Sequence, residues 1–173
     1  MDWLYRLVRR YRPIRAVETG VYFGKSTVAI LAALQRNDAG RLISIDMPVT
    51  PAQTHARTPK SIGKLVPASL SDRWELRLGD ARQLLPPVLL EGVDFFLHDS
   101  DHTYGHMTFE YEAAWRALSI GGVLASDDTK WSSAWVEFLE RHRDEYRPLP
   151  DGPAQHRAIR KGAGTVRNLA LKP

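Results

Sequence analysis

Two apolar runs of the chain, Val93–Leu97 and Gly122–Ala125, lead into acidic side chains. Runs of this length with polar ends are typical of buried parallel strands. The segment between them predicts an amphipathic helix, and strands joined by one helix in a parallel sheet end at the same edge. We therefore predict an α/β fold in which Asp99 meets Asp127 and Asp128. Three converging carboxylates repel one another unless a hard cation lies among them, so a metal site is expected there.

The chain has 173 residues, of which 43% are hydrophobic and 25% charged, and this composition predicts one globular domain. Within it we expect an N-terminal helix over residues 1–13, a motif-bearing core over 14–131, and a C-terminal helix with closing strands over 132–173. No apolar run approaches the roughly 20 residues of a membrane span, and no signal peptide is recognisable. The absence of cysteine excludes disulfides and thiolate chemistry, and the cytoplasm is the expected compartment.

The formal net charge is +4, and the basic residues gather near the two ends of the chain. An excess of basic residues raises the question of a nucleic-acid partner. No basic strand with interleaved aromatic residues accompanies these arginines and lysines, however. We expect solvated basic faces, or a contact between copies of the chain in a homo-oligomer, in preference to nucleic acid.

The first strand is predicted over Ile14–Glu18, and a turn with Gly20 and Gly24 follows it. Glycine permits a sharp turn and the close approach of a ligand to the main chain. A helix is predicted from Lys25 to about Gln35, with Ser26 at its start. Unpaired N–H groups at a helix start favour a bound carboxylate or phosphate. This turn is therefore a candidate binding site for a negatively charged group.

A second buried strand, Arg41–Asp46, ends in an acid some 20–30 residues after the glycine turn. An acid at this position typically binds the two hydroxyls of a ribose. The turn is not the G-x-G-x-x-G signature of NAD-binding proteins, because its two glycines lie four residues apart. Residues from Met47 to about Pro59 form an expected long loop. A short helix is expected within Ser61–Leu70.

The third strand is predicted over Trp74–Leu78, and Asp80 follows it. Asp80 would cap the next helix or face a nucleotide base, and capping is the simpler expectation. In the second half of the chain, Gly121-Gly122 is expected to end a helix. The closing strands are expected at His156–Arg160 and Val166–Leu171. Two apolar stripes predict core-facing helices: Met107, Tyr111, Ala114, Trp115 and Leu118, then Trp131, Trp135, Phe138 and Leu139.

Together, the segments ETGVYFGKS, LISID, DFFLHDSDHTY and GGVLASDDTKW resemble the motifs of class I S-adenosylmethionine-dependent methyltransferases. The likeness is to the cation-dependent small-molecule O-methyltransferases, including the caffeoyl-CoA and catechol types. The Asp-Asp ending is closer to the macrolide and aminocoumarin sugar O-methyltransferases. The HDSDH segment is similar to a bacterial methyltransferase and cephalosporin-hydroxylase-like family. The resemblance covers about Val17 to Trp131.

The resemblance implies a Rossmann-like, doubly wound and mostly parallel seven-stranded sheet with helices on both faces and antiparallel last strands. It also implies methyl transfer from S-adenosylmethionine to a hydroxyl of a small molecule, assisted by a divalent cation, with Mg²⁺ the first choice. Glu18 and Gly20 would lie at the amino-acid end of the donor, Ser26 at its carboxylate and Asp46 at its ribose. The implied donor-binding set is Glu18, Gly20, Tyr22, Gly24, Ser26, Asp46, Met47, Asp80, Ala81 and Asp99. The implied metal ligands are Asp99, Asp127 and Asp128.

The general base stays open at this point. Catechol-type enzymes have a lysine three residues after the first metal ligand, and this chain has His102 there. Sugar-modifying relatives use an aspartate two residues after that ligand, which corresponds to Asp101. Either side chain could accept the proton of a hydroxyl group. His98 is expected to be a structural histidine, and His106 to be exposed.

Three other functions are compatible with parts of the sequence. The first is a metal-dependent hydrolase or lyase that uses His98, Asp99, Asp101, His102 and Asp127, although this leaves the glycine turn and Asp46 without a role. The second is an RNA or protein methyltransferase, suggested by the basic ends. The third is a cofactor-binding subunit without catalytic activity. The simplest structural explanation of Asp127 and Asp128 is that they cap a helix that begins near Trp131.

Overall fold

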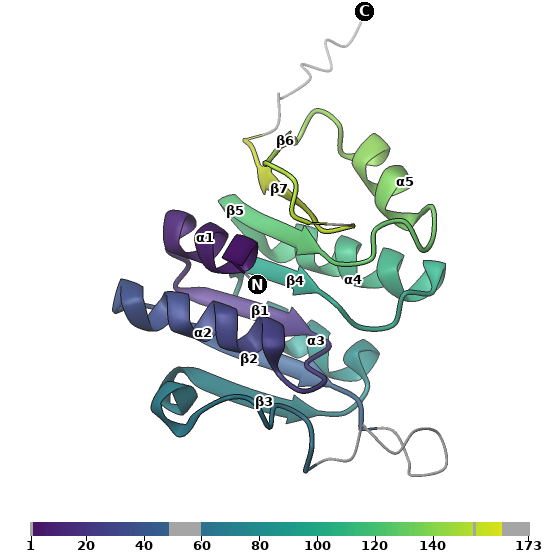
Figure 1. Cartoon of the computed structure of the whole chain (residues 1–173). Helices are drawn as coiled ribbons and strands as arrows, with labels where there is room; N and C mark the ends of the chain where they lie inside the picture. Colours follow the sequence, from purple (N-terminus) through teal and green to yellow (C-terminus); the bar gives the residue numbers. More distant parts are fainter. Residues whose placement is uncertain (1, 49–59, 154, 164–173) are drawn as a thin grey trace, which may run out of the picture.

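The computed structural model describes residues 2–48, 60–153 and 155–163, and seven strands in these residues form one sheet (Figure 1). The strands are β1 (Arg15–Thr19), β2 (Arg41–Asp46), β3 (Trp74–Leu78), β4 (Val93–His98), β5 (Leu118–Ser126), β6 (Tyr146–Pro148) and β7 (Arg157–Lys161). The helices are α1 (Asp2–Tyr11), α2 (Lys25–Asn37), the 3₁₀ helix η1 (Ala68–Arg73), α3 (Ala81–Leu89), α4 (Tyr104–Ala117) and α5 (Ala134–Arg141). The predicted α/β class is confirmed.

The order of the strands in the sheet is β3-β2-β1-β4-β5-β7-β6. The first five strands pair in parallel, and β7 and β6 are antiparallel, which confirms the predicted closing of the sheet. Strand order reverses at β1, whose neighbours are β2 on one side and β4 on the other. In open α/β sheets a ligand binds outside the carboxyl ends of the strands at such a reversal.

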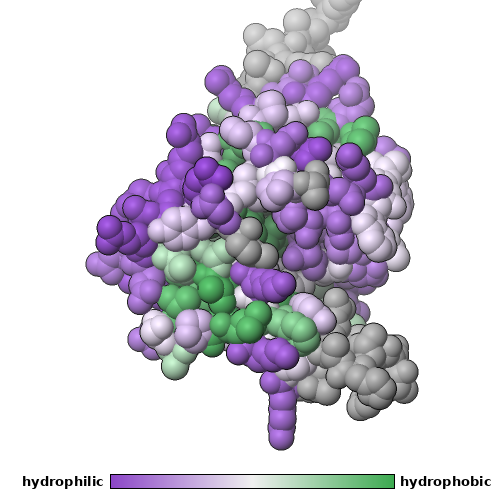
Figure 2. Space-filling view, viewed as in Figure 1, coloured by the Kyte–Doolittle hydropathy of each residue, from purple (hydrophilic) through white to green (hydrophobic). Residues whose placement is uncertain are grey.

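Helices cover both faces of the sheet, as Figure 1 shows. The side chains of a strand point alternately to its two faces. Ala16 therefore belongs to the apolar cluster under α1 and α2, whereas Val17 belongs to the cluster with α3, α4 and α5. In Figure 2, most of the surface on the α2 side is polar, and apolar side chains gather over α2. None of the helices in the described parts of the chain could cross a membrane.

The predicted end of a helix at Gly121-Gly122 is wrong. Helix α4 already ends at Ala117, and both glycines lie inside β5. Leu118 is buried and pairs with Val93, so the chain passes from helix to strand without a loop. The register between β4 and β5 then shifts at the position of the glycines, and glycine in a strand often marks such an irregularity.

Trp131 is not part of the apolar stripe of α5, which corrects a second prediction. The helix begins at Ala134 after the N-cap Ser133, so Asp127 and Asp128 do not cap it. Trp135 and Phe138 are buried as expected, whereas Trp131 is 67% exposed. The prediction therefore began this helix three residues too early, because the aromatic side chain of Trp131 happened to match the helical spacing.

The remaining elements differ little from expectation. The short helix expected within Ser61–Leu70 is a 3₁₀ helix, η1, displaced toward β3. The first closing strand is β6, a short segment that the sequence analysis did not single out, and the second is β7 near the predicted His156–Arg160. The proposed strand at Val166–Leu171 lies outside the described residues. Asp80 caps α3, because its Oδ1 accepts a hydrogen bond from the Arg82 amide at 2.8 Å.

Candidate functional site

A pocket of about 690 Å³ opens at the carboxyl ends of the parallel strands, beside the reversal of strand order. Its walls are formed by Gly20, Ile45–Met47, Gly79–Arg82, Ser100–Thr103, His106 and Trp131. These segments lie at or after the carboxyl ends of β1, β2, β3, β4 and β5, and His106 lies in the first turn of α4. The sequence motifs that lie far apart along the chain therefore meet at one place.

The structure brings together about half of the predicted site residues at this pocket. The ones that line it are Gly20, Asp46, Met47, Asp80, Ala81, Asp101 and His102. The predicted residues outside its lining are Glu18, Tyr22, Gly24, Ser26, Asp99, Asp127 and Asp128. Lining residues that the sequence analysis did not assign to the site include Arg82, Ser100, His106 and Trp131.

The turn after β1 is fastened to the end of β2 by the Asp46 carboxylate. Asp46 Oδ2 accepts hydrogen bonds from the amides of Val21 at 2.9 Å and Tyr22 at 2.7 Å. Gly20 has a φ of +82°, and an added Cβ would lie 1.8 Å from the carbonyl oxygen of Asp99. The predicted need for glycine in this turn is therefore real, because the main chains of the first and fourth strands nearly touch there.

A Gly20→Ala substitution is expected to destabilise the protein far more than Gly92→Ala. Both glycines have a positive φ, but an added Cβ at Gly92 would lie 3.7 Å from its nearest neighbour. Gly92→Ala should therefore cost only about 1–2 kcal/mol for the left-handed conformation, whereas Gly20→Ala adds a clash with main-chain atoms. Urea unfolding of the two variants measures the difference. Equal losses of stability would contradict the close approach at Gly20.

Glu18 lies fully buried beneath this turn. Its Oε2 accepts hydrogen bonds from the hydroxyls of Thr27 and Ser44, each at 2.8 Å. Its Oε1 is buried and has no hydrogen-bond partner among the described residues. Burial raises the pKa of Glu18 to about 6, although the hydroxyl donors oppose the shift. A buried acceptor without a partner is uncommon in folded proteins, and Glu18 does not line the pocket.

The acids after β4 and β5 lie on adjacent strand ends, as the sequence predicted. His98 pairs with Ser126 in the register of the two strands, and the Asp127 amide donates to the His98 carbonyl at 2.9 Å. Burial, followed by the charges of Asp127 and Glu18, raises the pKa of Asp99 to about 8. Asp99 is therefore held in a region with an excess of negative charge.

Each of the two later aspartates has a histidine nearby. The Nε2 atom of His156 lies 3.2 Å from Asp127 Oδ1, and that of His102 lies 3.8 Å from Asp128 Oδ2. His156 follows the turn before β7, and the sequence analysis assigned it only to a strand. Across residues 2–48, 60–153 and 155–163, no three acidic, histidine or cysteine side chains are already placed around one metal position. The predicted ligands are thus neighbours that do not yet form a coordination shell.

The two candidate bases have different surroundings. Asp101 is exposed, and its two carboxylate oxygens accept hydrogen bonds from the amide and hydroxyl of Thr103. Both contacts are to Thr103, the N-cap residue of α4, so Asp101 orders the start of that helix. His102 Nε2 is buried and has no hydrogen-bond partner within the described part of the chain. Burial, followed by the neighbouring His98, lowers the pKa of His102.

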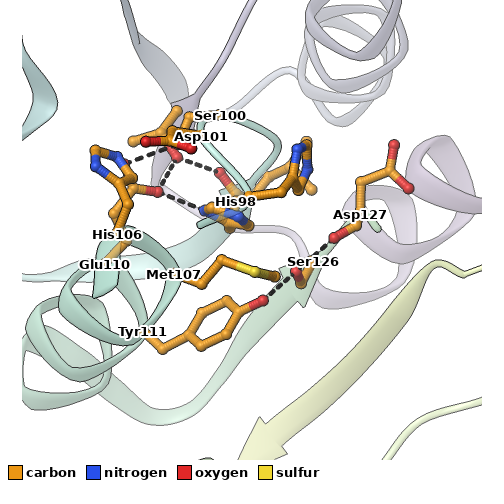
Figure 3. Close-up of polar contacts among 12 residues, drawn as sticks. His98, Ser100, Asp101, His106, Met107, Glu110, Tyr111, Ser126 and Asp127 are labelled. Carbon is orange, nitrogen blue, oxygen red and sulfur yellow. Dashed lines mark hydrogen bonds and ion pairs between the residues drawn. The ribbon is translucent and has the colours of Figure 1, made fainter. Parts of the chain in front are cut away.

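A buried polar cluster behind the pocket was not anticipated, and Glu110 is its centre (Figure 3). The fully buried carboxylate of Glu110 accepts a hydrogen bond from the His98 ring at 2.6 Å and from the His106 ring at 2.8 Å. The expectation that His106 is exposed is wrong, because only 9% of this residue is accessible. His98 is buried and bonds to Glu110 through Nδ1, but its Nε2 has no hydrogen-bond partner among the described residues, so its structural role stays a prediction. Burial alone would raise the pKa of Glu110, but the bonds from both histidines outweigh it and lower the pKa to about 2.

This low pKa predicts a specific loss of stability in acid. A carboxylate whose pKa is lower in the folded state stabilises the protein above its unfolded pKa of about 4.5. That contribution disappears as the pH falls toward about 2. The gap in unfolding free energy between the wild type and Glu110→Gln should therefore shrink between pH 6 and pH 3. Urea titrations at both pH values measure the gap, and an unchanged gap would contradict the assignment.

The model of a family described as a methyltransferase domain matches residues 17–129, which is more than half of the chain. Among proteins with curated functions, none matches the sequence significantly. Solved structures with a similar fold include an O-methyltransferase from Bacillus cereus in complex with S-adenosylhomocysteine. It has 21% identity and a TM-score of 0.64, and the match covers 92% of this chain and 80% of that one.

The O-methyltransferase TomG from Streptomyces achromogenes, in complex with S-adenosylmethionine, has 18% identity and a TM-score of 0.65, with 93% and 78% of the chains covered. A structure of CmcI with magnesium and S-adenosylmethionine has 18% identity and a TM-score of 0.66, with 94% and 71% covered. At these identities the structural likeness concerns the fold, whereas the family match concerns the sequence itself. The chain therefore belongs to the methyltransferase-domain family, and it is a methyltransferase with the class I fold.

Proposed function

We propose that the protein is an S-adenosylmethionine-dependent O-methyltransferase that methylates a hydroxyl group of a small molecule with the help of a divalent cation. One observation carries this proposal. Gly20, the Asp46 carboxylate and the loop after β4 line one pocket of about 690 Å³ at the strand-order reversal, and the acids after β5 follow the neighbouring strand end. Solved structures with this fold bind the same donor or its product, and one of them also contains magnesium.

The residues at the pocket suit S-adenosylmethionine. The two amides of the turn already occupy Asp46 Oδ2, so a ribose would bind through Oδ1. Asp80 and Ala81 line the pocket beyond Asp46, where the adenine would lie. Glu18 lies behind the Gly20 turn and outside the pocket lining, and we assign its partnerless Oε1 as the acceptor for the ammonium group of the donor. The methyl group on the donor's sulfonium is itself an electrophile, so the protein must align a nucleophilic oxygen with it.

The chemistry of the carboxylates suits a hard cation such as Mg²⁺. Asp99, Asp127 and Asp128 offer oxygen ligands in a region where negative charge is already in excess. A cation bound there would lower the pKa of an acceptor hydroxyl. The three side chains would have to turn toward one position when the ion binds, because Asp127 and Asp128 now lie beside His156 and His102.

The cation part of the proposal predicts that Asp127→Asn weakens magnesium binding by about tenfold or more. The reason is that the substitution removes one charged ligand while it keeps the size of the side chain. Isothermal titration of the protein with Mg²⁺, in the presence of S-adenosylhomocysteine, measures the affinity. Asp72→Asn is the control, because Asp72 is exposed on η1, away from this pocket. Equal affinities of the two variants would exclude Asp127 as a ligand.

Calorimetric titration with S-adenosylmethionine and S-adenosylhomocysteine, each with and without magnesium, tests the proposed function. We expect both compounds to bind at micromolar or lower concentrations and to raise the melting temperature. A hydrolase or lyase built on the same acids would bind the metal but neither compound. Release of S-adenosylhomocysteine in the presence of a panel of phenols and sugars then identifies the acceptor class. Absence of binding by both compounds would overturn the proposal.

A further inference from the structure

Glu110 makes an unusual number of contacts for a side chain that does not line the pocket. Its Oε2 accepts hydrogen bonds from Thr19 Oγ1 at 2.5 Å and His98 Nδ1 at 2.6 Å. Its Oε1 accepts from His106 Nε2 at 2.8 Å and Ser100 Oγ at 3.0 Å. The carboxylate is fully buried, and it joins the ends of β1 and β4, the loop after β4 and the first turn of α4 (Figure 3).

Three of the four donors to Glu110 lie at or next to the pocket. Ser100 and His106 line the pocket directly. The carbonyl of Thr19 accepts a hydrogen bond from the Asp99 amide at 2.9 Å, immediately before the Gly20 turn. The Glu110 carboxylate therefore bonds to the side chain of Thr19, which precedes the Gly20 turn, and to that of Ser100, which follows Asp99.

We propose that Glu110 is a positioning residue of the donor site, which keeps the Gly20 turn and the Asp99 loop in the arrangement that binds S-adenosylmethionine. This inference rests on the proposed function and deepens it. Four donors converge on two oxygens, and a carboxylate is the only side chain of this shape that offers acceptors at both. Glutamine in its place would present an NH₂ group to two of the donors. One pair of contacts would then open, and the strand ends would no longer be fixed relative to each other.

A matched control lies one half-turn further along the same helix. Glu112 also accepts contacts from a histidine and an arginine, with its Oε2 3.2 Å from His142 Nε2 and its Oε1 3.4 Å from Arg141 Nη1. These partners belong to α5 and its C-cap, and neither lines the pocket. Glu112→Gln therefore removes one carboxylate charge and two longer ion pairs from α4 without touching the pocket.

Isothermal titration with S-adenosylhomocysteine compares the wild type, Glu110→Gln and Glu112→Gln, after circular dichroism has shown that each variant is folded. We expect Glu110→Gln to raise the Kd by about 10-fold to 100-fold, the usual effect of removing a residue that orients binding groups. Glu112→Gln should stay near the wild-type value. Wild-type affinity in Glu110→Gln would overturn the inference and leave the proposed function standing. Absence of binding by the wild type would overturn the proposed function itself.

If Glu110→Gln does not fold, nuclear magnetic resonance of the wild type labelled with ¹⁵N-histidine provides a second test of the inference. His98 does not line the pocket, but it shares the Glu110 carboxylate with two residues that do. We expect the His98 ring signals to shift when S-adenosylhomocysteine is added. His142, which bridges Glu112 and Glu145, serves as the internal control and should not respond. An unchanged His98 signal upon saturation with S-adenosylhomocysteine would overturn the inference.

Discussion

His102→Ala should lower the rate of methyl transfer by about 10²-fold to 10⁴-fold, the usual contribution of a general base. The imidazole lines the pocket, and its Nε2 is buried without a hydrogen-bond partner among the described residues. The lowered pKa keeps this ring neutral near pH 7, and the neutral ring is the form that accepts a proton. The acid limb of the wild-type pH–rate profile should therefore lie below the ordinary histidine pKa of about 6.5.

The measurement is the release of S-adenosylhomocysteine with an acceptor that the wild type methylates. The affinity for S-adenosylhomocysteine should change little in His102→Ala, and added imidazole should restore part of the rate. Asp101→Asn is the companion variant, because Asp101 lines the same pocket but uses both oxygens on Thr103. A large loss in Asp101→Asn alone would assign the base to Asp101. Full activity in both variants would exclude both residues.

Asp46→Asn is expected to weaken the binding of S-adenosylhomocysteine by about 10-fold to 150-fold. Hydrogen bonds to a charged group contribute about 1.5–3 kcal/mol, which corresponds to this range of affinity. The asparagine oxygen can still accept from the Val21 and Tyr22 amides, so the turn should survive. Its NH₂ group would then face the ribose hydroxyls in place of an acceptor. The loss should therefore appear in binding more than in stability.

The chain offers a close control for this variant at the opposite end of the sheet. Asp94 Oδ2 accepts hydrogen bonds from two consecutive amides, those of Ile14 and Arg15, as Asp46 does for the glycine turn. Its Oδ1 accepts from Ser119 Oγ at 3.0 Å. Asp94→Asn should leave the affinity for S-adenosylhomocysteine unchanged. Calorimetry on both variants makes the comparison, and equal affinities would remove Asp46 from the donor site.

Much of the architecture was predictable because each strand carries its own signal. Apolar runs that end in acids marked β4 and β5, and the third strand was predicted at the residues where β3 lies. The convergence of Asp99 and Asp127 followed from the rule that parallel strands joined by one helix end at the same edge. The glycine turn was identified in the same way, from residue type and its place between a strand and a helix.

Other parts of the site could not be predicted, because their partners are far apart in the sequence. Trp131 matched the spacing of a helix, yet it lies outside α5 and lines the pocket. His156 and Asp127 come within 3.2 Å of each other only because the turn before β7 folds back onto the loop after β5. No local sequence pattern around His156 or Asp127 predicts that contact.

The sequence by itself determined most of the strands and helices along the chain, the edge of the sheet where acidic and glycine residues gather, and the family of the chain. Periodicity and strand-end chemistry are local properties, and a single sequence contains them. Only the tertiary structure decided what each polar side chain contacts. Glu110 appears in the sequence as one more acid on an amphipathic helix, but packing buries it and surrounds it with four donors from three other segments and its own helix. Burial depends on the whole fold, and so do the hydrogen bonds from His98 and His106, which lower the pKa of Glu110 although burial alone would raise it.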